Sequence, residues 1–543
     1  MSVNVELSTD IWETVDGVHL CGTLLHQGRV VSCEELHELV DSIENDQIIS
    51  LFTDITGSFA LIVETEERTI LATDTEKTVP LYYTTSGDVV VSDRYYRLEQ
   101  RLSSSFCIPE GVCLEFVASR FVSKEDTLHP EIQKVAAGEI VEIRNSGELT
   151  RSAYYPSGSV DADLDIRTSA FVSDALDEAF ENLHSVVGSA PVILRLSGGL
   201  DSRLVAYKLA EHDFENVYTY THAIESDSEL EPAAYIADQL GFEWIGFDHT
   251  PEDYQRFFKS DQWHEIEQLV GGYGTTEPRL RIALSLQKLS GEDTFPDSGY
   301  VLSGFSPFHA GEKFPESYRQ TEKRVTGGEI ADALIKHGYL LGRLTAAEQD
   351  ELKAHLMDKF EIADSLTAGR GVDFFEKWHL YERLPSKSGT NIHEYNYWGY
   401  QLWYPLRDSA VLKAYERIPL ADRYDRTFLT EYVTNLDEEF LENPSVVQSS
   451  PRSRLRERLE NAIVETPLES SARRLRAVVR SISTTTAEAL YEQRADGLRF
   501  AEIDELSDSH AFKNYLVFDE LDRSRLEIER TSNTERVRKL LST

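Results

Sequence analysis

Short apolar runs, broken by Gly, Asp and Thr, recur through the first 155 positions of the chain. Runs of this kind between turn-forming residues are typical of β-strands. The pattern predicts strands at residues 48–52, 58–64, 69–73, 79–84, 89–92 and 138–143. Residues 157–165 are rich in Ser and Asp and suit a linker. We therefore expect a β-rich amino-terminal domain over residues 1–155.

Strand-like and helix-like patterns alternate after the linker. Helices are predicted at 170–183, 202–211 and 229–240, and strands at 191–196, 217–221, 243–247 and 300–302. This alternation predicts a doubly wound parallel sheet with helices on both faces, which would bind ligands at the carboxyl ends of its strands. We expect this α/β domain over residues 156–440. A helical, Arg-rich extension is expected over residues 441–543, either as surface helices that pair with acids or as a docking face.

One segment between a predicted strand and helix has the composition of a phosphate site. It reads Ser197-Gly198-Gly199-Leu200-Asp201-Ser202. The two glycines let main-chain N–H groups approach an anion, and the following helix adds its positive end. Hydroxyls of Ser197 and Ser202 could donate to phosphate oxygens. An acid beside a phosphate cradle favours Mg²⁺, so Asp201 is the candidate metal ligand.

This hexapeptide resembles the signature loop of the PP-loop ATP pyrophosphatases, and the chain from about residue 50 to 440 resembles their asparagine synthetase branch. The segment 228–241 looks like the family's helix after the loop. The stretch from Trp398 to Asp408 is similar to its G-x-E-x-R-x-P-F-L-D segment. Upstream, residues 57–60, Asp74, 80–83 and 92–93 resemble the second half of its glutaminase (Ntn-type) domain.

The resemblance implies that ATP binds with its base near the strand at 217–221 and its triphosphate on the loop. A carboxylate (aspartate, or a carboxylate on a sugar or peptide) would form an acyl-adenylate, which ammonia or an amine would convert to an amide. The cofactors implied are ATP and Mg²⁺. The cofactor-binding residues implied are Ser197, Gly198, Gly199, Leu200, Asp201 and Ser202. The catalytic candidates are Asp201, Ser197 and Arg203, and Arg203 either contacts an anion or pairs with an acid.

Three departures from the family pattern limit this expectation. Ser2 stands where the glutaminase needs a cysteine, so we expect a degenerate domain that does not hydrolyse glutamine. The segment 303–312 keeps Ser-Gly but lacks the family's acids, apart from Glu312. Near residue 426 the family has a lysine. Arg426 could hold pyrophosphate there but, with its fixed charge, cannot exchange a proton.

The charge and the cysteine content limit which partners and which cellular compartment we expect. The chain has 54 basic and 95 acidic residues, a net charge of −41, which disfavours binding to nucleic acid or anionic membranes. An acid-rich surface suits a high-salt cytoplasm such as that of a haloarchaeon, where screening acts within about 3 Å at molar salt; an acidic protein from an ordinary cell is the alternative. No apolar run approaches the ~20 residues of a membrane span. The four cysteines lack metal-site spacing. We expect a soluble, cytoplasmic protein.

Two classes of function stay open, with a minor third. The first is an AMP-forming amide ligase that uses ammonia or a substrate amine. The second is a nucleotide-binding pseudoenzyme or accessory protein of the same family. The missing acids favour the pseudoenzyme, and the intact loop with Asp201 favours the ligase. Nitrogen or sulfur transfer to RNA bases is the third, and the strongly acidic charge disfavours it.

Overall fold

The fold is described from a computed structural model of the 543-residue chain. It describes residues 3–447 except 9–10, 42–47, 103–105, 107, 120, 156–167, 225–229, 271–278, 340–343 and 388–391. Ser2, Cys107, the expected linker at 157–165 and the part of the expected Arg-rich extension beyond residue 447 therefore lie outside the described residues. Within the described part, no helix is long and apolar enough to cross a membrane.

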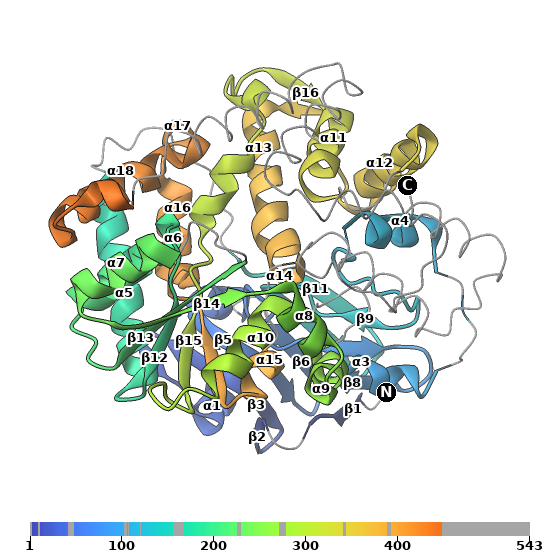
Figure 1. The fold of residues 1–543 in the computed structure, drawn as a ribbon. Coiled ribbons are helices and arrows are strands. Elements are labelled where there is room, and N and C mark those ends of the chain that lie inside the picture. Colours follow the sequence, from blue (N-terminus) through green and yellow to red (C-terminus); the bar gives the residue numbers. More distant parts are fainter. Residues whose placement is uncertain are drawn as a thin grey trace.

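The amino-terminal region is built on two β-sheets (Figure 1). The larger has the strand order β11-β10-β6-β5-β3-β2 and the smaller the order β1-β8-β7-β9, with β4 paired to β3. The strands are β1 (Val3–Glu6), β2 (Trp12–Val15), β3 (Val18–His26), β4 (Arg29–Val30), β5 (Ile55–Glu64), β6 (Arg68–Thr73), β7 (Tyr82–Thr84), β8 (Val89–Ser92), β9 (Gln133–Lys134), β10 (Glu139–Arg144) and β11 (Leu149–Ala153). The helices of this region are α1 (Cys33–Asp41), α2 (Ile48–Thr53), α3 (Tyr95–Glu99) and α4 (Glu110–Ser119).

A five-stranded parallel sheet forms the centre of the second region, in the order β14-β13-β12-β15-β18. Its strands are β12 (Val192–Arg195), β13 (Val217–Ile224), β14 (Glu243–His249), β15 (Gly299–Leu302) and β18 (Tyr400–Trp403). Strands β12 to β14 are connected by helices, α6 (Leu200–Glu211) and α7 (Leu230–Leu240). The expected mixed α/β fold with a parallel sheet is therefore confirmed.

Helices cover both faces of this sheet because its strands alternate their side chains between two cores. Val192 and Leu194 enter one core, against α5 (Thr168–Val187), α6 and α7. Ile193 enters the other, against α10 (Leu280–Leu289). The latter face also carries α8 (Pro251–Phe258), α9 (Asp261–Val270) and α15 (Ile392–Asn396), as Figure 1 shows.

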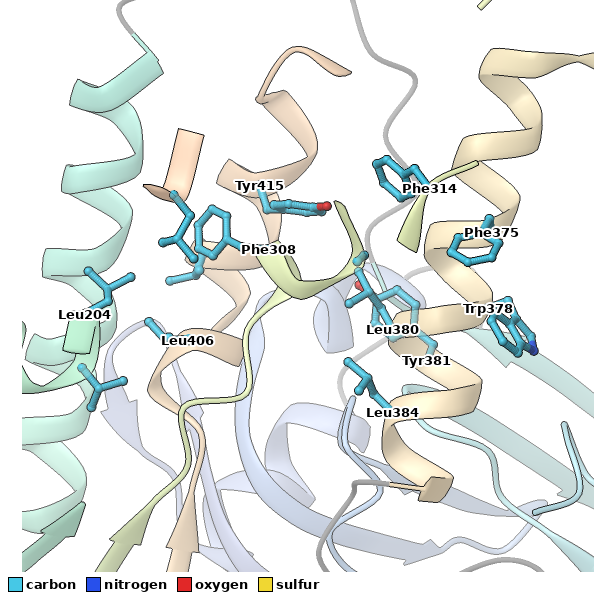
Figure 2. Close-up of a cluster of buried hydrophobic side chains, with 14 of the residues drawn as sticks. Leu204, Phe308, Phe314, Phe375, Trp378, Leu380, Tyr381, Leu384, Leu406 and Tyr415 are labelled. Atoms are coloured by element: carbon cyan, nitrogen blue, oxygen red, sulfur yellow. The ribbon is translucent and has the colours of Figure 1, made fainter. Parts of the chain in front are cut away.

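The remaining helices extend the first core beyond the sheet. They are η1 (Pro307–Lys313), η2 (Glu316–Tyr318), α11 (Gly327–Gly338), α12 (Ala346–Lys359), α13 (Ala368–Lys377), η3 (Trp378–Arg383), α14 (Leu384–Lys387), η4 (Pro405–Arg407), α16 (Ser409–Arg417), α17 (Leu420–Arg423), η5 (Tyr424–Arg426), α18 (Thr427–Phe440) and η6 (Pro444–Val446), with a small antiparallel sheet of β16 (Arg324–Thr326) and β17 (Ser365–Thr367). Figure 2 shows Phe308 of η1 near Leu204 of α6 and Tyr415 of α16. The Phe308 and Tyr415 rings meet edge to face with centroids 5.4 Å apart. This contact packs the segment after β15 against α16.

Buried contacts join the amino-terminal sheets to the parallel-sheet region. Glu76, which follows β6, pairs with Arg407 of η4, and both side chains are almost fully buried. Burial raises the pKa of Glu76 to about 7, against the opposing charge of Arg407. Tyr155 stacks on Tyr381 with ring centroids 3.9 Å apart. The two regions therefore share an interior.

Several local expectations need correction. Residues 48–52, expected as a strand, form helix α2, with Ile48, Leu51 and Phe52 buried on one side. The pattern of a short apolar run does not separate a buried strand from a short buried helix. The strand expected at 79–84 is shortened to β7, because Pro80 interrupts its start. Strands β1 to β4, β9, β11, β16, β17 and β18 were not expected.

Candidate functional site

The loop after β12 lies where the strand order of the parallel sheet reverses. The chain enters the sheet at β12, proceeds to β13 and β14 on one side, and then crosses to β15 on the other side. Adjacent loops at such a point leave in opposite directions and open a crevice at the carboxyl ends of the strands. Residues 196–199 follow β12 and residues 303–306 follow β15 at this crevice. The predicted loop therefore lies at the edge of the sheet where this topology favours ligand binding.

The hydroxyls of the loop hold the loop itself together. Ser202 Oγ accepts from the Ser197 amide at 3.0 Å, lies 2.9 Å from Ser197 Oγ and donates to the Ser197 carbonyl at 3.0 Å. The Gly199 amide donates to Ser197 Oγ at 3.2 Å. Both serines were expected to donate to phosphate. In this structure their hydroxyls fix the bend that joins β12 to α6, and their donation to phosphate stays a prediction.

Several main-chain amides of the loop have no acceptor in the protein and are therefore the hydrogen-bond donors available to a ligand. Within the described residues, the amides of Gly198, Leu200, Asp201 and Ser202 make no hydrogen bond. Three of them belong to the first turn of α6, whose amides have no acceptor within the helix. They combine with the positive end of the helix into a site for an anion.

The first glycine of the loop, Gly198, is not required by the protein's own packing, whereas a Cβ on Gly199 would lie 3.2 Å from Ser197 Oγ, a tight contact. Neither Gly198 nor Gly199 has a positive φ. A Cβ built on Gly198 would meet Pro232 at 3.5 Å, an ordinary contact. Gly304, after β15, is different, because a Cβ there would lie 3.1 Å from the amide nitrogen of Ser202. The absence of a side chain at 198 therefore keeps space open next to the unpaired amides, as a bound anion would require.

Asp201 is engaged on both carboxylate oxygens. The Ser306 hydroxyl donates to Oδ1, and the Arg426 guanidinium donates to Oδ2. In the described part of the chain, no cluster of three or more His, Cys, Asp or Glu side chains could hold a metal ion. Mg²⁺ is usually bound through carboxylates together with substrate phosphates. The residues here do not fit that ion well, because it would have to displace Arg426, and the metal role of Asp201 stays a prediction.

Arg203 points away from the loop. Its guanidinium donates to Asp437 of α18 at 2.6 Å, and both side chains are buried. Tyr207, one turn further along α6, donates to the other oxygen of Asp437 at 2.6 Å. Of the two roles that the sequence left open, pairing with an acid is the one observed. Arg203 belongs to the packing of α6 against α18.

Two arginines that sequence reasoning passed over lie at the same end of the sheet. Arg195 is the last residue of β12 and pairs in register with Tyr220 of β13. Arg279 precedes α10, and its guanidinium lies 5.5 Å from the ring of Phe305. Within the described residues neither guanidinium makes a hydrogen bond or ion pair. In a chain of net charge −41, half-buried arginines without carboxylate partners indicate an anionic ligand. The sequence signal for Arg195 was a charged residue at the end of an otherwise apolar strand.

A buried histidine beside these arginines is held neutral. His222 Nδ1 lies 3.0 Å and His249 Nε2 lies 2.9 Å from Ser285 Oγ, which donates to the Arg281 carbonyl at 2.8 Å. The hydroxyl has one proton, so both ring nitrogens must donate to it. Burial, and then the charge of Arg195, hold the pKa of His222 well below its usual range. Its Nε2 is therefore an acceptor at the end of β13.

Cys21 and Cys33 are not activated. Burial raises the pKa of Cys21 to about 12 and that of Cys33 to about 11. Both side chains are buried, and both are free thiols. A thiol nucleophile requires a lowered pKa. None of these described thiols fits the nucleophile of a glutaminase.

Comparison with protein families matches one segment of the chain. Residues 172–273 match the family model described as asparagine synthase, and this segment runs from α5 through the loop to the end of α9. A search of curated proteins found no match. The match supports an ATP-dependent ligase in general terms and covers less than half of the chain.

Solved structures give weaker likenesses. A glutamine-dependent NAD⁺ synthetase from Acinetobacter baumannii in complex with ADP is 16% identical, over 39% of this chain and 45% of that chain, with a TM-score of 0.19. A glutamine phosphoribosylpyrophosphate amidotransferase from B. subtilis, complexed with ADP and GMP, is 13% identical, over 56% and 64%, with a TM-score of 0.18. The chain thus spans less than two thirds of either protein. Likeness at these TM-scores supports neither a shared fold nor a shared function.

Proposed function

We propose that this protein is an AMP-forming amide ligase that binds ATP on the loop at residues 197–202. The unpaired amides at the start of α6 are the observation that carries the proposal, because they form an anion site at the reversal point of a parallel sheet. The family match over the same residues supports ATP as the anion. The amides of Gly198, Leu200, Asp201 and Ser202 would hold the phosphates.

The chemistry needs two anions brought together in a fixed orientation. A carboxylate oxygen attacks the α-phosphorus, the bond to the β-phosphate breaks and pyrophosphate leaves. An amine then attacks the acyl carbon, loses a proton and displaces AMP. Donors aimed at the phosphates stabilise the charge that moves to the leaving pyrophosphate, and fixed positions remove most of the entropy cost. Mg²⁺, where bound, would supply further charge neutralisation.

The acyl substrate and the base have candidate partners on the neighbouring strands. Arg195 and Arg279 offer guanidinium groups to a carboxylate, with the ring of Phe305 beside them. Nε2 of His222 is an acceptor, which matches an exocyclic amine such as that of adenine. We propose a carboxylate such as aspartate, or one carried on a sugar or peptide, as the acyl substrate.

Ammonia or a substrate amine is the proposed nitrogen donor. The raised pKa values of Cys21 and Cys33 support it, because neither thiol is available as a glutaminase nucleophile at neutral pH. The free thiols of these two residues also support a reducing cytoplasm as the compartment. The amino-terminal sheets would then serve as a scaffold for the ligase site.

A nucleotide-binding pseudoenzyme is the second candidate. The pairing of Asp201 with Arg426 favours it, because the acid that would hold Mg²⁺ is already engaged. Exchange of labelled pyrophosphate into ATP separates the two. The ligase predicts exchange when one member of a panel of carboxylates is present, in molar KCl if the acidic surface requires it. Saturable ATP binding without exchange for any acid would instead establish the pseudoenzyme.

A further inference from the structure

The ion pair between Asp201 and Arg426 occupies the place where a metal ion is expected. Arg426 reaches the loop from the junction of η5 and α18, far along the chain from the loop. Its side chain is 9% exposed and that of Asp201 is 20% exposed. With Ser306 on the second oxygen, the carboxylate is held from two sides. The positive charge next to the unpaired amides is therefore supplied by a protein side chain, that of Arg426.

The position of Arg426 is built by its surroundings. Gly311 of η1 packs so closely under the segment that a Cβ there would lie 1.8 Å from the Arg423 carbonyl oxygen. Arg423 donates at 2.5 Å to buried Glu376, which also accepts from Tyr415 at 2.5 Å.

The backbone at this junction is strained. Asp425 and Arg426 both have left-handed backbones, with φ of 53° and 56°. Two consecutive non-glycine residues in this conformation cost conformational energy, and the surrounding packing has to hold them there. Such strain is common where a side chain must be aimed at a ligand.

The charges available at the loop favour a resident cation over a divalent ion. Among the described residues, Asp201 is the carboxylate at the loop, and no metal-ligand cluster is present. The Ser303-Gly304-Phe305-Ser306 segment that faces it across the crevice contributes no acid. A guanidinium has five N–H donors and a permanent charge, so it can bind Asp201 and a phosphate group at once.

We propose that Arg426 is the resident cation of the phosphate site and that Asp201 positions it, so that nucleotide binding here does not depend on a divalent metal. The inference rests on the proposed function, because it assumes that a nucleotide binds at the loop. It changes the role of Asp201 from metal ligand to positioning residue. Asp201 orients the guanidinium, the amides of α6 hold the phosphate oxygens, and Arg426 supplies the neutralising charge.

The test measures ATP affinity by isothermal titration calorimetry, in MgCl₂ and in EDTA, for the parent and three variants. For the parent we expect affinities that agree within about threefold in the two buffers. For Arg426→Gln we expect a loss of at least about tenfold in EDTA, the range of a hydrogen bond to a charged group. MgCl₂ should partly restore this variant, since Asp201 is then released. Arg417→Gln removes an exposed arginine stacked on Phe171 and is the matched control, expected to bind as the parent does.

The isosteric variant Asp201→Asn separates the two roles of the acid even if Arg426→Gln fails to fold. A positioning role predicts an equal loss of affinity in MgCl₂ and in EDTA. A metal-ligand role predicts a loss in MgCl₂ alone and would overturn the inference, as would a parent that binds ATP in MgCl₂ but not in EDTA. Either result leaves the proposed nucleotide site standing. Absence of ATP binding in both buffers would remove the proposed function itself.

Discussion

Gly198→Ala is the substitution that separates the ligand's needs from those of the fold. The new Cβ would meet Pro232 at 3.5 Å, which is ordinary contact, and the backbone at 198 is not left-handed. The free energy of unfolding should therefore change by less than about 1 kcal/mol, with stabilisation possible through the unfolded chain. A phosphate seated on the amides of 198 and 200–202, however, would be pushed away from them by the methyl group.

The loss of affinity can be bounded from those amides. Displacing one charged phosphate from one or two N–H donors costs about 1.5–3 kcal/mol, or roughly 10- to 150-fold in the dissociation constant. Calorimetric titration with ATP measures the loss, and urea unfolding of the same preparation measures stability. Gly291→Ala is the matched control, since its Cβ would also make only ordinary contacts, at 3.5 Å. Unchanged ATP affinity in folded Gly198→Ala would refute the cradle at this loop.

Four further substitutions test other parts of the account. Arg203→Gln leaves Asp437 buried without its charge partner, so urea unfolding should show a loss of about 3–5 kcal/mol while ATP affinity in the folded protein is kept; a selective loss of affinity would restore Arg203 to the site. Arg195→Gln and Arg279→Gln should raise the carboxylate concentration needed for half-maximal pyrophosphate exchange and leave the dissociation constant of ATP unchanged; the reverse pattern would place these arginines on the nucleotide. Burial raises the pKa of Glu76 from 4.5 to about 7, so the folded state holds its proton to higher pH, and the free energy of unfolding should fall between those pH values. Glu76→Gln should remove up to about 1.4 kcal/mol per pH unit of that slope, and an unchanged slope would contradict the assignment.

The parallel sheet and its loop could be read from the sequence because local and global signals agree there. The apolar run from Val192 to Leu196 ends at two glycines, and the helical pattern that follows is long and regular. Strand β18 could not be found in this way, because Tyr400–Trp403 is short and joins the sheet only through contacts with β15, about a hundred residues earlier. Helix α2 was wrongly predicted as a strand for a related reason, because six residues are too few to separate the helical repeat from the strand repeat.

The chemistry of the site could be predicted only in part from the sequence. The motif predicts that phosphate-binding amides follow β12, but it says nothing of which acid or base comes from distant segments. Arg426 reaches Asp201 across 225 positions, and Asp437 reaches Arg203 across 234. Such pairs depend on how α18 packs on α6, which no local pattern encodes. Arg195 was readable in principle, because a charged residue that ends a buried strand is unusual.

Hydrogen exchange of the loop amides, followed by mass spectrometry with and without ATP, tests the central claim most directly. If the amides of residues 198 and 200–202 hold the phosphates, peptides covering α6's first turn should exchange more slowly at saturating ATP, while peptides from the edge strand β14 are less affected. The same protection should be weakened in Gly198→Ala. Unchanged exchange of the loop peptides at an ATP concentration that saturates binding would show that the nucleotide is held elsewhere.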